Sequence, residues 1–229
     1  MKLKLSRLQI SILIIFMVLL IDQCVKIWIK THFYIGQEVN VLGNWFIIHF
    51  TENEGMAFGM KFGGEFGKLA LSLLRIIAVS FIGYYLIKLI KENAPKLLTF
   101  GLTMIFAGAL GNIIDSVFYG LIFNESYFHV AQLFPDGGGY GTFLHGKVVD
   151  MLYFPILQGT YPDWVPLWGG QEFLFFRPVF NIADSAITLG VIILIISQKE
   201  SIFGRKKKTD FQETPGEEAM NTTSSEEAV

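Results

Sequence analysis

The stretch FNIADSAITLGVIILIIS, residues 180–197, places an aspartate at the start of an apolar run. A helix that crosses a bilayer needs about 20 mostly apolar residues, and this run approaches that length. Asp184 lies in its first turn, where a carboxylate is costly unless it faces other protein groups or water. Ionisable groups in such positions are candidates for function by default. The run therefore predicts both a membrane span and a candidate site.

Three more apolar runs of spanning length precede this one. The four predicted spans cover about 8–29, 69–90, 97–119 and 180–197. The composition agrees, since 52% of the 229 residues are hydrophobic and only 17% are charged. That balance excludes an ordinary soluble domain. We therefore expect a mainly α-helical membrane protein with four transmembrane helices.

The first run follows basic residues, as the apolar part of a cleaved signal peptide does. It lacks a small-residue cleavage site and continues through Trp28, so we interpret it as a span. Lysine and arginine also gather in the link 91–96 and after the fourth span. By the positive-inside rule, both termini are then cytoplasmic, and segments 31–67 and 120–179 face outward.

The outward segments and the tail differ in character. Residues 45–51 are β-branched and aromatic, which favours a strand in a small sheet at the membrane surface. Residues 124–146 are rich in glycine and predict a loop, whereas 161–178 are rich in aromatic residues and proline, which suits a membrane interface. The tail 200–229 is basic and then acidic with little apolar content, so we expect it to be cytoplasmic and disordered.

Carboxylates lie at or near the outer ends of the predicted spans. They are Asp22, Asp115, Asp150 and Asp184. On the third span, Gly108, Asn112 and Asp115 fall on one helical face, and small residues there let another helix approach closely. The fourth span repeats the pattern, with Asn181 three residues before Asp184.

Each of these carboxylates also has a purely structural interpretation. Asp22 and Lys26 are four residues apart on one predicted helix and can form an ion pair. Asp115 could make a helix-end hydrogen bond, and Asp150 could be a surface loop residue. Asp184 could be a carboxylate favoured by the dipole at a helix N-terminus. Spacing alone leaves open which of them meet.

If two of the carboxylates meet, they cannot both ionise easily and will share a proton. The charged one can take a proton from water while the protonated one donates to a carbonyl oxygen or a leaving amine. That is aspartic peptide hydrolysis, which needs no metal or cofactor. The histidines are scattered and predict no metal site: His32, His49, His129 and His145. We find no nucleic-acid-binding signature. A proton-coupled transporter and a non-catalytic scaffold remain as alternatives.

Five blocks of the sequence resemble, in order, the motifs of the type II signal peptidases, the lipoprotein signal peptidases of bacteria. The blocks are DQCVKIWIK from Asp22, NEGMAFG from Asn53, GALGNIIDSVFYG from Gly108, VVDML around Asp150 and FNIADSAI from Phe180. They extend over residues 22–187, most of the chain. Five such blocks in order within four predicted spans are highly specific.

The resemblance implies a single membrane-embedded peptidase domain over 1–199. It would carry an extracytoplasmic β-cradle built largely from about 33–62 and a periplasmic helix within roughly 151–178. The implied activity is aspartic endopeptidase cleavage of diacylglyceryl-modified prolipoproteins just before the lipidated cysteine. The implied location is the bacterial inner membrane, with the active site at its periplasmic face. Prolipoprotein signal peptides and membrane lipids would be partners, cyclic peptide inhibitors such as globomycin would bind, and no cofactor is implied.

The resemblance also implies which residues form the site. Asp150 and Asp184 would be the catalytic pair. Other residues at or beside the family motif positions, which would support the site or contact substrate, are Asp22, Lys26, Asn53, Gly55, Gly108, Asn112, Asp115, Asn181 and Ala183.

The chain departs from the family pattern in two places that bear on the site. Ser116 stands where an arginine usually follows the aspartate of the third-span motif, and the loop 121–146 is longer than usual. Asp115 then either needs another cation or is satisfied by hydrogen bonds alone. The candidate cations are Arg177, Lys147 and Arg75.

Overall fold

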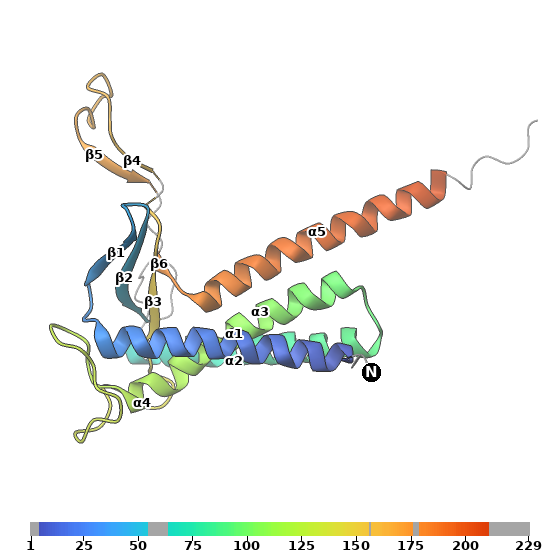
Figure 1. Cartoon of the computed structure of the whole chain (residues 1–229), viewed down its shortest axis with the longest axis horizontal. Coiled ribbons are helices and arrows are strands. Elements are labelled where there is room, and N and C mark those ends of the chain that lie inside the picture. Colours follow the sequence, from blue (N-terminus) through green and yellow to red (C-terminus); the bar gives the residue numbers. More distant parts are fainter. Residues whose placement is uncertain (1–4, 55–63, 156, 176–178, 211–229) are drawn as a thin grey trace, which may run out of the picture.

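The computed structural model of the chain describes residues 5–54, 64–155, 157–175 and 179–210. Long helices lie together, and a small sheet stands across one end of them (Figure 1). The long helices are α1 Arg7–His32, α2 Gly64–Lys91, α3 Lys96–Ile114 and α5 Ile182–Asp210. Within the described residues, three helical stretches are long and apolar enough to cross a membrane, and a fourth apolar stretch is shorter. In order they are Arg7–His32, Phe66–Lys91, Lys96–Ile122 and Ile182–Gln198.

Local features mark the start of α1 and the continuation of α3 beyond its last α-helical residue. Ser6 caps α1: its hydroxyl accepts from the Gln9 backbone N–H at 3.2 Å, and its own N–H donates to the Gln9 side chain at 2.8 Å. This reciprocal arrangement is a capping box. Beyond Ile114, α3 continues as a π-helical segment, η2 Asp115–Tyr119, and the short α4 Gly120–Ile122. Segments of π-helix are rare and frequently occur at functional sites, and this one begins at Asp115.

The larger sheet is antiparallel and combines both predicted outward segments. Its strand order is β1-β2-β3-β6. The strands are β1 Glu38–Leu42, β2 Phe46–Asn53, β3 Val148–Tyr153 and β6 Val179–Phe180. The expectation that the sheet comes largely from residues 33–62 holds only for its first half, because β3 and β6 come from the second outward segment. Residues 55–62 of the expected cradle lie outside the described part of the chain.

Strand β3 has two faces with different roles. Val149 and Met151 are fully buried and belong to an apolar cluster with Ile29, Phe50 and Tyr119, among others. Because side chains alternate along a strand, Asp150 points to the opposite face. In the register of the sheet it lies opposite Thr51 of β2. The apolar cluster therefore holds β3 against α1 while its other face carries a carboxylate.

Helices α3 and α5 approach each other closely at small residues, as the sequence predicts. A Cβ added to Gly108 would lie 2.2 Å from the carbonyl oxygen of Ala183, and one added to Gly190 would lie 2.6 Å from that of Gly101. Real Cβ atoms do not come so near to backbone oxygens, so only glycine allows this packing. The close approach brings the first turn of α5 against the last turns of α3.

Between β3 and β6 the chain forms a second, separate hairpin of β4 Leu157–Thr160 and β5 Glu172–Phe175. The expectation of a periplasmic helix within 151–178 is therefore wrong for residues 157–175, which form strands and turns. At the C-terminal side, α5 continues to Asp210, so residues 200–210 of the expected disordered tail extend this helix. Residues 211–229 lie outside the described part of the chain.

Candidate active site

Asp150 and Asp184 come together where β3 meets the N-terminus of α5, and Asn181 joins them. Asp150 is only 3% exposed, and its Oδ1 accepts a hydrogen bond from Asn181 Nδ2 at 2.7 Å. The Asn181 side-chain oxygen accepts from the backbone N–H of Asp184 at 2.8 Å. In return the Asn181 N–H donates to Asp184 Oδ2 at 3.3 Å. This is a capping box for α5, and it fixes Asp184 at the positive end of the helix dipole.

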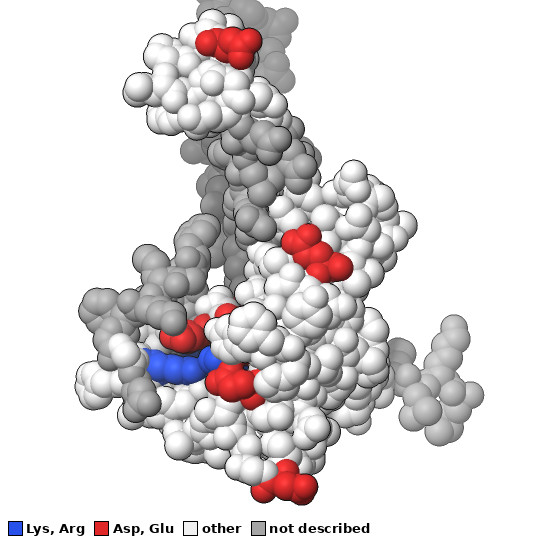
Figure 2. Space-filling model, turned by 90° about the vertical axis from the view of Figure 1, so that its left-hand side faces the viewer, with Lys and Arg blue, Asp and Glu red and all other residues white. Residues whose placement is uncertain are grey.

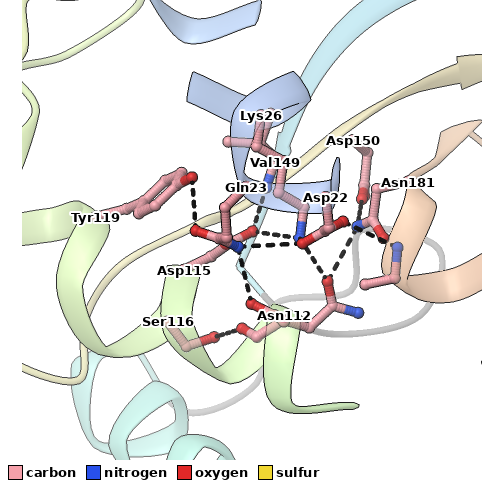
Figure 3. A network of polar contacts seen from close by, with 12 residues as sticks. Asp22, Gln23, Lys26, Asn112, Asp115, Ser116, Tyr119, Val149, Asp150 and Asn181 are labelled. Atoms are coloured by element: carbon pink, nitrogen blue, oxygen red, sulfur yellow. Dashed lines mark hydrogen bonds and ion pairs between the residues drawn. The ribbon is translucent and has the colours of Figure 1, made fainter. Parts of the chain in front are cut away.

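Two further asparagines bind the carboxylates of this pair. Asn112 of α3 donates from Nδ2 to Asp184 Oδ1 at 2.8 Å. Asn53, the last residue of β2, donates to Asp150 Oδ2 at 3.4 Å. Asn112 Oδ1 also accepts from Asn181 Nδ2 at 3.1 Å. The spacing left open which residues meet. In the structure Asn112 and Asn181 bond each other, and Figure 3 shows Asn181 facing Asp150.

A second pair of aspartates lies beside the first and holds a lysine between them (Figure 3). Lys26 Nζ is 2.8 Å from Asp22 Oδ2 and 2.8 Å from Asp115 Oδ2, and all three side chains are completely buried. Asn112 Oδ1 accepts from the same ammonium group at 2.9 Å. The predicted pairing of Asp22 with Lys26 is present, and it extends to Asp115. We call Asp22, Lys26 and Asp115 the lysine centre.

Backbone groups and neighbouring side chains complete the lysine centre. Asp22 Oδ1 accepts from the backbone N–H of Ala183 at 2.9 Å, and Asp115 Oδ2 accepts from that of Val149 at 3.3 Å. The centre is therefore bonded to both elements that carry the first pair, α5 and β3. A Cβ on Gly111 would lie 2.9 Å from Asp22 Oδ2, so this glycine leaves room for the carboxylate.

Gln23 is part of the same network, and sequence reasoning missed it. Its Nε2 donates to Asp115 Oδ1 at 2.9 Å and to Asp22 Oδ2 at 3.1 Å, and its Oε1 accepts from Tyr119 Oη at 3.1 Å. A glutamine beside an aspartate inside an apolar span is the signal that could have identified it, because buried amides are normally hydrogen-bonded.

Lys26, which was not among the candidates considered from the sequence, forms an ion pair with Asp115. Lys147 pairs instead with Glu52 at 3.5 Å and Glu125 at 3.4 Å. The positive charge of Arg75 in α2 acts on Asp184, Asp150 and Asp115. Arg177 lies outside the described residues. Ser116 donates to the backbone carbonyl of Asn112 at 3.0 Å, so it takes no part in balancing charge.

The Lys147 pairs belong to a charged cluster behind the sheet that ties down the long loop. Lys30 is completely buried and forms an ion pair with Glu52, whose side chain is 3% exposed. Ser126 of the loop donates to Glu52 Oε1 at 3.1 Å. On the face of the molecule that Figure 2 shows, the one basic patch lies against acidic atoms. Charge on this side of the sheet is thus largely paired.

Burial raises the pKa of Asp150 to about 7, and the neighbouring charge of Asp184 acts in the same direction. Hydrogen bonds from Asn181 and Asn53 oppose this rise only in part. A pKa of about 7 lets Asp150 take either the protonated or the ionised form near neutral pH.

Other predicted site residues are placed as follows. Gly108 and Ala183 form the closest contact between α3 and α5, and Gly55 lies outside the described residues. Among the described residues, no group of three or more His, Cys, Asp or Glu side chains is placed to hold a metal ion. The chemistry available at the site is that of carboxylates, amides and buried ion pairs.

Apolar helices with a buried polar centre at one end, where a carboxylate has a shifted pKa, define an integral membrane enzyme. A model of the family described as signal peptidase (SPase) II matches residues 14–199. The chain therefore belongs to the signal peptidase II family, as the five sequence blocks predict. It is accordingly a hydrolase and a multi-pass protein of the bacterial inner membrane.

Curated relatives and solved structures agree with this assignment. A lipoprotein signal peptidase of Porphyromonas gingivalis is 50% identical over 190 residues, which are 82% of each chain. One of Amoebophilus asiaticus is 39% identical over 205 residues, 88% of this chain and 83% of the relative. A bacterial membrane enzyme solved by the in meso method is similar with a TM-score of 0.53 and 25% identity, covering 90% of this chain and 94% of that one. A second such structure has a TM-score of 0.54 and 28% identity, with 82% and 91% covered.

Proposed function

We propose that this protein is an aspartic endopeptidase that removes the signal peptide of diacylglyceryl-modified prolipoproteins, cutting just before the lipidated cysteine, with Asp150 and Asp184 as its catalytic pair. The observation that carries the proposal is their link through Asn181, which bonds Asp150 directly at 2.7 Å and the backbone of Asp184 at 2.8 Å. Neutral amides bind both carboxylates, and burial together with the charge of Asp184 raises the pKa of Asp150 to about 7, so the pair can share a proton near neutral pH.

The environments of the two aspartates assign their roles. Asp150 is the more buried, and its raised pKa favours the protonated form. Asp184 lies in the first turn of α5, where the helix dipole and the Asn112 amide stabilise a negative charge. Asp184 is then the general base and Asp150 the general acid.

The reaction follows from these two states. Asp184 removes a proton from water, and the oxygen attacks the scissile carbonyl carbon. Asp150 gives its proton to the carbonyl oxygen as the tetrahedral intermediate forms. When the intermediate collapses, the C–N bond breaks, the leaving amine takes the proton that Asp184 accepted, and a hydroxyl of the intermediate returns a proton to Asp150 as the carboxyl product forms. General acid and base catalysis of this kind contributes typically about 10²–10⁴-fold to the rate.

The lysine centre would support this chemistry without taking part in it. Lys26 holds Asn112 by its Oδ1 at 2.9 Å, and the Nδ2 of the same side chain bonds Asp184. Asn112 is thereby fixed in one orientation, with its donor toward the catalytic base. Asp22 of α1 accepts from the Ala183 N–H and so fixes the start of α5, which carries Asp184, relative to α1.

The same proposal includes orientation and partners. Four helices cross the inner membrane, both termini are cytoplasmic, and the aspartates lie at the outer face, where water reaches them. Basic residues near the N-terminus, in 91–96 and after 198 support this orientation. Reporter fusions after Lys208 and within 124–142 should then report opposite sides, and same-side signals would contradict it. Membrane lipids surround the helices, and globomycin-type cyclic peptides would occupy the site.

The deciding experiment compares two substrates in the same bilayer. One is a prolipoprotein peptide with a diacylglyceryl cysteine, and the other carries a free thiol. Two acyl chains anchor the substrate stably, at about 0.8 kcal/mol per buried methylene, and fix the depth of the scissile bond. We expect cleavage of the lipidated peptide only. Equal kcat/KM values would indicate a general intramembrane aspartic protease, and no cleavage of either would support a transporter or a scaffold.

A further inference from the structure

The hairpin of β4 and β5 has no role in the chemistry proposed above. It extends beyond the larger sheet, away from the helices and roughly perpendicular to α1 (Figure 1). Among the strands that the structure describes, these two pair only with each other. A lone two-stranded hairpin is at best marginally stable in water. This hairpin therefore needs a further surface to stabilise it.

The tip of the hairpin, residues 161–171, turns large apolar side chains outward. Trp164 is 80% exposed, Leu167 is 89% exposed and Trp168 is 56% exposed. Asp163 is the one charged residue in this stretch. In Figure 2 the tip is the knob at the top of the molecule, uncharged except for one acidic patch. The composition is that of a surface that meets an apolar environment.

The backbone of the tip is hydrogen-bonded within itself. The N–H of Gly170 donates to the carbonyl of Tyr161 at 2.9 Å, and that of Gly169 donates to Val165 at 2.9 Å. The N–H of Gln171 donates to Trp168 at 3.0 Å. Backbone groups can approach lipid only when they are paired within the protein. These bonds pair backbone groups within the tip and hold it as an ordered loop that presents its side chains.

Leu167 has a backbone conformation that leucine rarely adopts. Its φ is +71°, in the left-handed region, which bulky residues avoid. Such strain costs on the order of 1–3 kcal/mol and persists mostly where it serves a purpose. Here the strained residue holds one of the most exposed apolar side chains of the protein away from the hairpin.

We propose that residues 161–171 are seated in the interface of the membrane leaflet next to the larger sheet, with Trp164, Leu167 and Trp168 at the level of the upper acyl chains. Along the direction of α1, the tip lies at the level where that helix ends (Figure 1). This is the depth at which tryptophan and tyrosine are enriched in membrane proteins. The inference requires that α1–α3 cross a bilayer, and it does not depend on the aspartate chemistry.

The hairpin is inserted between the strands that lead to the two aspartates. Its base is closed by the pairing of Tyr153 with Val179 and of Leu152 with Phe180. A tip held at one depth in the bilayer therefore limits how far β3 and the start of α5 can move along the bilayer normal. The kinetic consequence, a constant depth for Asp150 and Asp184 relative to an anchored substrate, rests on the proposed function.

Tryptophan fluorescence tests the anchoring without any assay of activity. Replacement of Trp28 and Trp45 by phenylalanine leaves Trp164 and Trp168 as the only tryptophans. In liposomes we expect strong quenching by lipids brominated near the headgroup, weaker quenching by lipids brominated near the chain ends, and weak quenching by aqueous iodide. Quenching by iodide equal to that of a free tryptophan derivative would place the tip in water and overturn the proposal. No quenching by either agent would mean that protein covers the tip, which also overturns it.

A kinetic comparison tests the consequence. The double variant Trp164→Ser/Trp168→Ser should raise KM for the lipidated substrate in liposomes by about three- to tenfold, because small misplacements of reacting groups are costly. In detergent micelles, which adapt their shape, KM should stay within twofold or so of the parent value. Asp163→Ser, at the same tip, is the matched control and should leave KM unchanged in both. An equal rise in micelles would point to altered folding rather than lost anchoring, and would contradict the depth argument.

Discussion

Two pairs of aspartates lie side by side in this protein, and they differ in what stands between them. Asp22 and Asp115 share the ammonium of Lys26 at 2.8 Å each. Asp150 and Asp184 are linked instead by Asn181, whose side-chain N–H binds the Asp150 carboxylate and whose side-chain oxygen accepts from the Asp184 backbone N–H. An ammonium group between two carboxylates favours ionisation of both more strongly than neutral amides do, so the second pair is the one that can keep a transferable proton. The first pair therefore suits structure, and the second suits catalysis.

Asn112 connects the two pairs. Its oxygen accepts from Lys26 at 2.9 Å and its nitrogen donates to Asp184 at 2.8 Å. Because an ammonium group can only donate, it dictates which end of the amide faces it. The lysine centre thereby sets the direction of the hydrogen bond that Asn112 makes with Asp184. Substitutions of Asp150 or Asp184 should therefore lower activity and spare stability, whereas loss of Lys26 should lower stability.

The largest expected effect is on activity, from substitutions in the second pair. Asp150→Asn and Asp184→Asn should each lower kcat/KM by more than about 10³-fold, since acid and base act as a unit. Neither substitution should lower the thermal midpoint in detergent. Cleavage of a lipidated peptide by purified variants is the measurement. Near-normal turnover in either variant would show that the catalytic pair is assigned wrongly.

The next effect is on stability, from the first pair. Lys26→Met leaves two buried carboxylates without their cation, and breaking a buried ion pair in this way costs about 3–5 kcal/mol. The matched control is Asp115→Asn, which keeps Lys26 paired with Asp22 and should cost less. Chemical or thermal unfolding in detergent measures both. If Lys26→Met folds normally but loses activity, then Lys26 acts in catalysis and the contrast between the pairs fails.

Sequence reasoning anticipated the parts of this arrangement that depend on local spacing. Asn112 and Asp115 lie three residues apart on one helix, as do Asn181 and Asp184, and helical periodicity is enough to place each pair on one face. The glycines of α3 predicted close packing with another helix, and Gly108 provides it against Ala183. The resemblance to known motifs then indicated the family correctly.

The missed parts depend on contacts between distant segments. Lys26 reaches Asp115 from a helix 89 positions earlier in the chain, and no spacing rule reports such a contact. The strands β3 and β6 join a sheet that begins with β1, so the second outward segment completes a structure that the first one starts. The aromatic segment after β3 was expected to contain a helix, yet β4 and β5 pair with each other there. Strand pairing is a tertiary choice that local propensity does not determine.

A smaller effect is expected at the residue that connects the pairs. Asn112→Ala should lower kcat by about 10–10²-fold, because the donor to Asp184 is lost while both aspartates remain. Thr103 is a matched control on the same helix: it is buried, and it donates to the Thr99 carbonyl at 2.7 Å and contacts Ser11 at 3.2 Å, away from the site. Thr103→Ala should lower stability and leave kcat unchanged. Equal losses of kcat in both variants would indicate a general packing defect.

The pH dependence sharpens the contrast further. The raised pKa of Asp150, about 7, means that its proton is lost as the pH rises through that value. Since the general acid must be protonated, kcat/KM should fall above about pH 7 and approach a tenfold decrease for each further pH unit. Asp115→Asn, which keeps Asp150, should show the same fall in kcat/KM. A kcat/KM that keeps rising to pH 9 would contradict the role given to Asp150.

The smallest expected effect is a gain of stability from losing a catalytic group. Burial and Asp184 raise the pKa of Asp150 from 3.8 to about 7 in the folded protein, so the ionised form is disfavoured by folding. The stability that the protonated carboxyl contributes at low pH is then lost as the pH rises through about 7. A tenfold change in the acid dissociation constant on folding corresponds to about 1.4 kcal/mol. Hydrogen bonds that a carboxylate accepts better than an amide offset part of this free energy.

Asp150→Asn should therefore match the parent protein in stability at pH 5 and exceed it by about 1–2 kcal/mol at pH 9. For a chain of this size, that difference corresponds to a rise of roughly 2–8 °C in the thermal midpoint. Lys26→Met should be destabilised at both pH values, because its buried carboxylates lose their partner whatever happens at Asp150. Thermal unfolding of the three proteins at the two pH values in one detergent is the measurement. A loss of stability in Asp150→Asn at pH 9 would mean that Asp150 is held as a charged structural residue, like Asp22 and Asp115, and that the two pairs do not differ in kind.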